Sequence, residues 1–348
     1  MTYDDIVENI RRLSRGQRVS DDELYKLLLD NGCYYLLSKS EEYVQHCKSH
    51  IGVNSFIVGW RYAICQEFFE KLKDIPYAHM KGGALSSRIY GSPAYRLFGD
   101  IDLLTAPEYS ECVKRLLMEC GFVQGRIVNG KILPFSRQEI IFQKSFSHQI
   151  APFVKKTESK ICPIINVDVN LSIVWGEGDV PINMSEFISH SKCMKITNYD
   201  ICCLQPVWEF IALCMHHYKD MNSIYLIAER GFNLSEYCDI YFYIINVCPD
   251  ANKIVEISKK YGISDYVFYC IYYANEIFDD PRLSEYLNKL DSESARKLIC
   301  CYGLADFERK EWGVTFYERL FDRGFKEKFY ATLCEEDQRK VETNRNYM

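Results

Sequence analysis

The sequence predicts an α+β protein in which a small mixed β-sheet core lies between an N-terminal helical segment and a C-terminal helical domain. Apolar residues recur at helical intervals before residue 74 and again beyond residue 200. Residues 164–174 alternate apolar and polar side chains, which is typical of a half-buried strand. Between these regions, residues 77–80 have the pattern of a short strand that leads directly into Lys81 and a glycine pair. We expect a helical segment in 1–74, the α/β core in 75–180, a helical domain in 181–334 and a polar tail in 335–348.

The N-terminal segment carries ordinary helix signals. Asp21, Asp22 and Glu23 precede a run of leucines, as at a capped helix start. A longer helical pattern over 56–72 ends in charged residues, and Pro76 then interrupts the chain.

The core is expected to begin with a strand at 77–80, a short helix at 84–90 and a turn at 91–93. A second strand should cover 97–105, followed by a helix that starts near Pro107 and ends at Gly121. Residues 122–175 have the pattern of strands, with Asn129-Gly130 as a hairpin turn. Beyond residue 200 the pattern is helical to about residue 333, and the polar tail after it is expected to be frayed.

Composition places the chain among ordinary globular proteins. It has 348 residues, 48% of them hydrophobic and 26% charged, which suffices for two domains. The net charge of −6 argues against nucleic acid as the main partner, since such proteins usually carry a basic excess. No apolar stretch is long enough to span a bilayer, and residues 1–5 do not resemble a secretory signal. We therefore expect a cytoplasmic protein without a membrane partner.

The 16 cysteines contain no Cys-x-x-Cys pair, and most lie among apolar neighbours. Free cysteine behaves as a small buried hydrophobe, and cytosolic thiols stay reduced. We expect reduced core thiols rather than metal ligands or redox centres.

Asp100 and Asp102 interrupt an otherwise apolar strand pattern. Because side chains of a strand alternate between its faces, both carboxylates should project together while Ile101 and Leu103 enter the core. Adjacent carboxylates repel each other and are costly to bury without a cation. A hard divalent metal held by oxygen ligands relieves that repulsion, so the pattern predicts a metal site.

Asp168 is the best candidate for a third carboxylate. It lies in the alternating strand pattern at 164–174, where Asp168 and Asn170 share one face and Val167 and Val169 share the other. A third acid on a neighbouring strand can complete a metal site or activate the nucleophile in phosphoryl chemistry.

The segment from Lys81 supplies candidate phosphate ligands. Backbone amides at a glycine-rich helix start hold phosphates, and Gly82, Gly83 and Ser86 fit this role. Lys81 is either a further phosphate ligand or a solvated lysine at a strand end. Arg96 is expected to pair either with a triphosphate or with the strand carboxylates.

These motifs resemble the nucleotidyltransferase superfamily with the polymerase-β-like core, and more narrowly the bacterial uncharacterised nucleotidyltransferase family. The resemblance lies in Lys81–Leu85, Tyr90–Ser92, Arg96 and Gly99–Leu104, followed by a later acid. It implies Mg²⁺ or Mn²⁺ at Asp100, Asp102 and Asp168, a nucleoside triphosphate donor such as ATP, and release of pyrophosphate. The acceptor would be a hydroxyl or amine of a small molecule or protein. The family often has a histidine two places after the third acid, where this chain has Asn170.

Two other functions stay open. A glycosyltransferase also uses Asp-x-Asp to bind a metal and a sugar nucleotide, although it would normally carry a nucleotide-binding α/β domain where this chain is helical. The other is a nucleotide-binding scaffold of the toxin–antitoxin type, which would bind a triphosphate without turnover.

Two histidine pairs are weaker candidates. His216 and His217 fit the histidine-bearing helix that follows the core in the family that the motifs resemble. We expect one buried and one exposed side chain, and the alternative is a role in binding the acceptor or as a base. His46 and His50 lie one helical turn apart and are expected to be a surface pair without further ligands.

Overall fold

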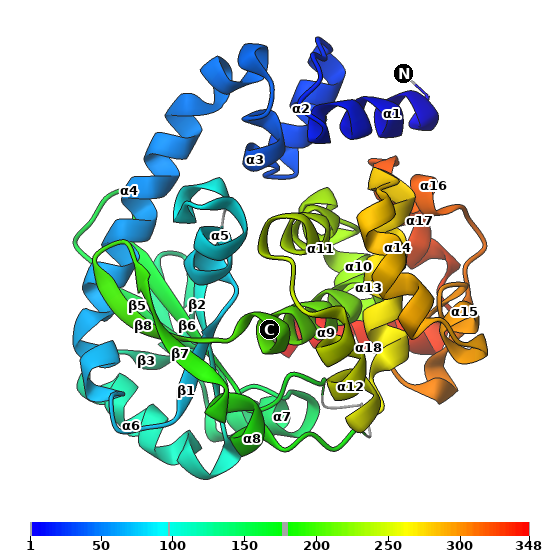
Figure 1. Ribbon diagram of the computed structural model, residues 1–348. Helices are drawn as coiled ribbons and strands as arrows, with labels where there is room; N and C mark the ends of the chain where they lie inside the picture. Colours follow the sequence, from blue (N-terminus) through cyan, green and yellow to red (C-terminus); the bar gives the residue numbers. More distant parts are fainter. Residues whose placement is uncertain (1, 97, 176–179, 348) are drawn as a thin grey trace. The chain divides into compact units, whose positions relative to one another are not determined.

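The computed structural model describes residues 2–96, 98–175 and 180–347 (Figure 1). Leu97, at the start of the expected second strand, lies outside the described residues. The chain packs as two compact units, one of Lys48–Ala212 and the other of Met1–Cys47 together with Leu213–Met348. The four-part division expected from the sequence stays a prediction.

The unit Lys48–Ala212 is built on one mixed eight-stranded sheet in the order β4-β3-β5-β6-β2-β1-β8-β7. Its strand bounds are β1 Tyr77–Met80, β2 Asp100–Thr105, β3 Val123–Val128, β4 Lys131–Pro134, β5 Phe153–Lys156, β6 Ile164–Asn170, β7 Ser191–Ile196 and β8 Tyr199–Leu204. The pairs β2–β6 and β1–β8 are parallel, and the other neighbours are antiparallel. The predicted mixed sheet, with helices toward both ends of the chain, is confirmed.

Helices flank and connect the strands of this unit, and the longest of them packs on the apolar face of the sheet. They are α4 Glu41–Lys71, α5 Gly82–Tyr90, α6 Ser110–Glu119, α7 Arg137–Phe146, α8 Met184–Ser189 and the start of α9 Pro206–Asn222. Tyr62 and Phe68 of α4 belong to the same buried cluster as Ile101, Leu103 and Val167 of the sheet. Burying this face turns the alternate residues of β2 and β6, including the aspartates, to the other face.

Two local expectations in this unit were wrong. Residues 137–146 form helix α7 instead of a strand, and its start carries a capping box in which Ser136 and Glu139 bond each other's backbone amides. Residues 200–204 continue in strand β8, where a helix was expected, because β8 pairs with both β1 and β7 in the sheet.

The other unit is almost entirely helical. It holds α1 Tyr3–Ser14, α2 Asp22–Asp30, α3 Tyr34–Leu37, α10 Ile224–Arg230, α11 Leu234–Val247, α12 Ala251–Lys260, α13 Ser264–Phe278, α14 Pro281–Leu290, α15 Glu293–Leu298, α16 Phe316–Phe321, α17 Phe325–Thr332 and α18 Glu335–Tyr347. A short hairpin joins β9 Cys301–Tyr302 to β10 Lys310–Glu311. None of the described helices combines the length and apolar character needed to cross a bilayer.

The N-terminal helices pack onto C-terminal ones within this unit. The Arg11 guanidinium of α1 donates hydrogen bonds to the carbonyls of Glu276 and Ile277, at 2.8 and 2.9 Å. These carbonyls belong to the last turn of α13, which lacks partners within the helix. A cation there also offsets the negative end of the helix dipole, so the contact fixes α1 against α13.

The expectation of a frayed tail was wrong. Residues 335–347 form α18, in which the Val341 side chain is buried and the Asp337 carboxylate pairs with Lys310 of β10. These two contacts hold the helix in place although its composition is otherwise polar.

Candidate functional site

The three predicted carboxylates lie together on one face of the sheet. Strands β2 and β6 are parallel neighbours, and Asp102 stands opposite Asp168 in the register. Asp100 is two residues from Asp102 on the same strand and therefore projects to the same face. Carboxylate oxygens of Asp100, Asp102 and Asp168 lie within 4.8 Å of one another. Such a group of oxygens is a fitting ligand set for a hard divalent cation.

Repulsion within this group is visible at Asp100. The neighbouring Asp102 charge, and then burial, raise the pKa of Asp100 to about 6. Lys81 and Arg96 oppose this shift, and so does Arg61 of α4. A bound cation would relieve the repulsion and favour the ionised form of Asp100.

Lys81 forms an ion pair with Asp102, one of the candidate metal ligands, and is not a solvated lysine. Its Nζ lies 3.1 Å from Asp102 Oδ2, and the Asp102 residue is 4% exposed. The Lys81 backbone has φ 52° and ψ −150°, a region that side-chain-bearing residues rarely adopt. Such a conformation costs of order 1–3 kcal/mol and persists only where the surroundings impose it.

The glycine pair permits the turn from β1 into α5. Gly82 has φ +51°, and a Cβ there would lie 3.2 Å from the Phe98 ring. A Cβ on Gly83 would lie 2.8 Å from the Tyr62 hydroxyl oxygen, closer than real contacts allow. Both positions therefore need glycine, and the first amides of α5, which lack partners within a helix, begin beside Lys81.

Tyr62 and His79 form a buried hydrogen-bonded pair next to this turn. The Tyr62 hydroxyl accepts from the Ala84 amide and lies 3.0 Å from His79 Nε2, while His79 Nδ1 lies 2.8 Å from the Met80 carbonyl oxygen. Since a carbonyl only accepts, Nδ1 carries the proton and Nε2 accepts from Tyr62. Burial lowers the pKa of His79 to about 4, so the ring is neutral near pH 7.

Asn170 and Gln149 form a polar chain behind Asp102. Asn170 Nδ2 lies 3.1 Å from the Leu103 carbonyl and 3.5 Å from Asp102 Oδ1. Gln149 Nε2 donates to Asn170 Oδ1 at 2.8 Å. The strand alternation indicated that Asn170 shares a face with Asp168, whereas no local signal indicated Gln149, which reaches Asn170 through an isolated β-bridge.

Ser86 and Arg96 were expected at the site, whereas Arg61 was not. Ser86 is fully buried and donates its hydroxyl proton to the Ser92 carbonyl at 2.7 Å, so its phosphate role stays a prediction. The Arg96 charge lowers the pKa of Asp100, and both expected roles of Arg96 stay predictions. Arg61 was missed: it donates to the Phe98 carbonyl, and its guanidinium lies 5.1 Å from the centre of the Phe98 ring.

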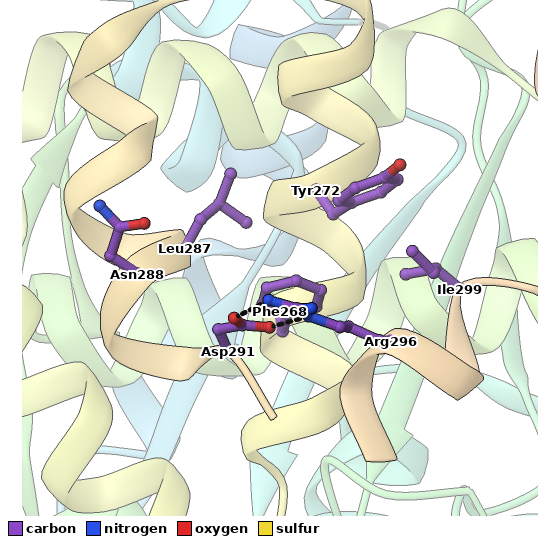
Figure 2. Close-up of a pocket in the computed structure, with 7 residues that line it drawn as sticks. All are labelled: Phe268, Tyr272, Leu287, Asn288, Asp291, Arg296 and Ile299. Atoms are coloured by element: carbon purple, nitrogen blue, oxygen red, sulfur yellow. Dashed lines mark hydrogen bonds and ion pairs between the residues drawn. The ribbon is translucent and has the colours of Figure 1, made fainter. Parts of the chain in front are cut away.

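A pocket of about 420 Å³ lies in the helical unit and contains none of these residues (Figure 2). It lies between α13, α14 and α15, and the Arg296 guanidinium donates to both carboxylate oxygens of Asp291 at its edge. The lining residues are Phe268, Tyr272, Leu287, Asn288, Asp291, Arg296 and Ile299.

Comparison with known proteins identifies the family. A family model described as an uncharacterised nucleotidyltransferase matches residues 62–279, more than half of the chain. The chain belongs to this family, as its motifs predicted. A search of curated proteins found no match. Among solved structures, an antigenic nucleotidyltransferase-like protein from Paracoccidioides brasiliensis shows 13% identity and a TM-score of 0.35, over 66% of this chain and 92% of that chain.

Proposed function

We propose that this member of the uncharacterised nucleotidyltransferase family transfers a nucleoside monophosphate from a nucleoside triphosphate, with ATP as the expected donor. The acceptor is a hydroxyl or amine of a small molecule or protein, and pyrophosphate is released. The observation that carries the proposal is the convergence of three carboxylates from β2 and β6 within 4.8 Å. Family membership supports the general reaction class.

The ligand set favours Mg²⁺, with Mn²⁺ as a substitute. All three candidate ligands are carboxylates, which suit small hard cations, and the raised pKa of Asp100 marks a charge excess that a dication would balance. Asp100 and Asp102 would hold the metals, and Asp168 would complete one of the sites. Bound metal would neutralise the triphosphate and polarise the phosphorus under attack.

The protein's own groups then hold the donor. We assign the phosphates to the backbone amides of Gly82 and Gly83, at the positive end of α5. Lys81, now 3.1 Å from Asp102, would turn to a phosphate once a metal takes over the carboxylate charge. Arg96 would add a second cation near the same charges.

Asp168 is the group that we assign to the acceptor. A carboxylate in register with Asp102 can take the proton of an attacking hydroxyl or amine while the acceptor is held beside the donor. The net charge of −6 disfavours a nucleic acid as acceptor and favours a small molecule or a protein.

The test is transfer of label from α-labelled nucleoside triphosphates. The full chain, Mg²⁺ and a cell extract supplying acceptors are incubated with each triphosphate, and pyrophosphate and labelled products are measured. We expect pyrophosphate release that EDTA stops and that the double variant Asp100→Ala, Asp102→Ala lacks.

Asp200→Asn is the matched control, because Asp200 is an exposed strand acid that is no part of the candidate site. Its activity should equal that of the native chain. Release of pyrophosphate that survives loss of both Asp100 and Asp102 would refute the proposed mechanism. A sugar nucleotide consumed in preference to every triphosphate would favour a glycosyltransferase instead.

A further inference from the structure

A second group of potential metal ligands lies in the helical unit. His216, His217 and Asp220 of α9 each offer one ligand atom, and these atoms lie within 4.8 Å of one another. His216 Nε2 is 3.0 Å from Asp220 Oδ2, one helical turn away. His217 is fully buried and Asp220 is 4% exposed, while 21% of the His216 side chain is exposed. His217 is the expected buried histidine, whereas His216 is partly buried instead of exposed.

Asp239 of α11 stands behind His217. Its Oδ2 lies 3.4 Å from His217 Nε2, and both side chains are buried. Metal-binding histidines commonly direct one ring nitrogen to a carboxylate, which fixes the tautomer and orients the ring. Asp239 is therefore close enough to serve as such an outer carboxylate from a second helix when His217 binds the metal through Nδ1.

We propose that His216, His217 and Asp220 form a binding site for a divalent transition metal of the zinc class. Two imidazoles and one carboxylate suit Zn²⁺, Co²⁺ or Fe²⁺, whereas Mg²⁺ prefers oxygen ligands alone. The site thus differs in metal preference from the all-carboxylate group of β2 and β6. The exposed edge of His216 gives the metal a route from solvent.

Arg230 and Lys219 compete with a metal for Asp220. Arg230 Nη2 lies 2.7 Å from Asp220 Oδ2, and Lys219 Nζ lies 3.9 Å from Oδ1. These cations balance the buried carboxylate when no metal is bound. A metal must therefore displace or share this charge, so removal of the Arg230 charge should strengthen metal binding.

The experiment is a Co²⁺ titration of the full chain, freed of any tag and of metal, followed by visible absorption. It is run on the native sequence and on Asp100→Asn, so that binding at the sheet carboxylates is recognised separately. In both backgrounds we expect one equivalent of Co²⁺ with strong ligand-field bands, displaced by Zn²⁺ and not by Mg²⁺, and any further Co²⁺ taken up by the sheet carboxylates of the native chain should be displaced by Mg²⁺. His216→Ala should abolish the bands, and Asp239→Asn should weaken binding about 10–100-fold.

Arg230→Gln should bind Co²⁺ more tightly than the native chain. His46→Ala is the matched control, since His46 is an exposed histidine of α4 that lies one helical turn from His50, the spacing that also separates His216 from Asp220. Far-UV circular dichroism checks that each variant is folded. His216→Ala should disturb the fold least, because the His216 side chain is partly solvated.

No saturable Co²⁺ band, or a band that His216→Ala leaves unchanged, would overturn the site. Weaker binding in Arg230→Gln would also count against it and favour a plain ion-pair network. Because the readout is absorption by bound metal, failure here leaves the nucleotidyl transfer untouched.

Discussion

Asp100→Asn should stabilise the metal-free protein while abolishing the proposed transfer. The Asp102 charge and burial raise the pKa of Asp100 from its usual 3.8 to about 6. A difference of about 2 in pKa, at about 1.4 kcal/mol each, corresponds to about 3 kcal/mol of destabilisation in the ionised form. Because the Asp100 side chain is partly solvated, we expect about 1–3 kcal/mol. An amide of the same shape removes this cost.

The stabilisation of the fold by Asp100→Asn should depend on pH. An acid whose pKa is higher in the folded than in the unfolded state destabilises the fold fully above the folded value and not at all below the unfolded one. The advantage of Asp100→Asn should therefore be complete above about pH 6 and fade toward pH 4. Thermal unfolding in EDTA measures it, at about 2–4 °C per kcal/mol for a unit of this size.

Asp102→Asn is the matched comparison. It relieves the same repulsion but loses the ion pair with Lys81, so it should stabilise less than Asp100→Asn. Saturating Mg²⁺ should raise the melting temperature of the native chain more than that of either variant. If Asp100→Asn is no more stable than the native chain at pH 7.5 in EDTA, or if its advantage persists at pH 4, the electrostatic reasoning fails.

Three further predictions concern the supports of the site. Gly83→Ala should cost about 1–3 kcal/mol in a thermal melt, because its Cβ would lie 2.8 Å from the Tyr62 hydroxyl. Since burial lowers the pKa of His79 to about 4, acidification from pH 6.5 toward 4 should cost about 3 kcal/mol in urea unfolding, and His79→Gln should remove that dependence. Glu209→Gln, which breaks the buried 3.0 Å pair with Arg88, should cost about 3–5 kcal/mol, and adding Arg88→Met should recover part of it.

Short-range patterns predicted which carboxylates share a strand face, and the structure brings these three carboxylates together. The alternation of Asp100, Ile101 and Asp102 depends only on the two-residue period of a strand, and so does that of Asp168 within β6. The glycine pair was equally informative, because the positive φ of Gly82 is a local property of the turn into α5, although the contact that excludes a Cβ at Gly83 comes from Tyr62 of α4. Helix α7 could have been predicted too, since its capping box at Ser136 is a local signal.

Contacts between distant segments had no such signal. The pairing of Gln149 with Asn170, the approach of Arg61 to Phe98, and the ion pair of Arg88 with Glu209 each join elements far apart in sequence. The sequence offers many polar residues that could pair with each of these side chains, and no local pattern indicates which one does.

The sequence alone determined that Asp100 and Asp102 share one face of a strand and that Asp168 and Asn170 share one face of another, because side-chain periodicity is a property of a few neighbouring residues. Only the tertiary structure decided that β6 lies beside β2 in parallel register, so that Asp168 faces Asp102, and that α1 packs against α13. Strand order and helix docking follow from burying all the apolar faces at once, and no short segment contains that information.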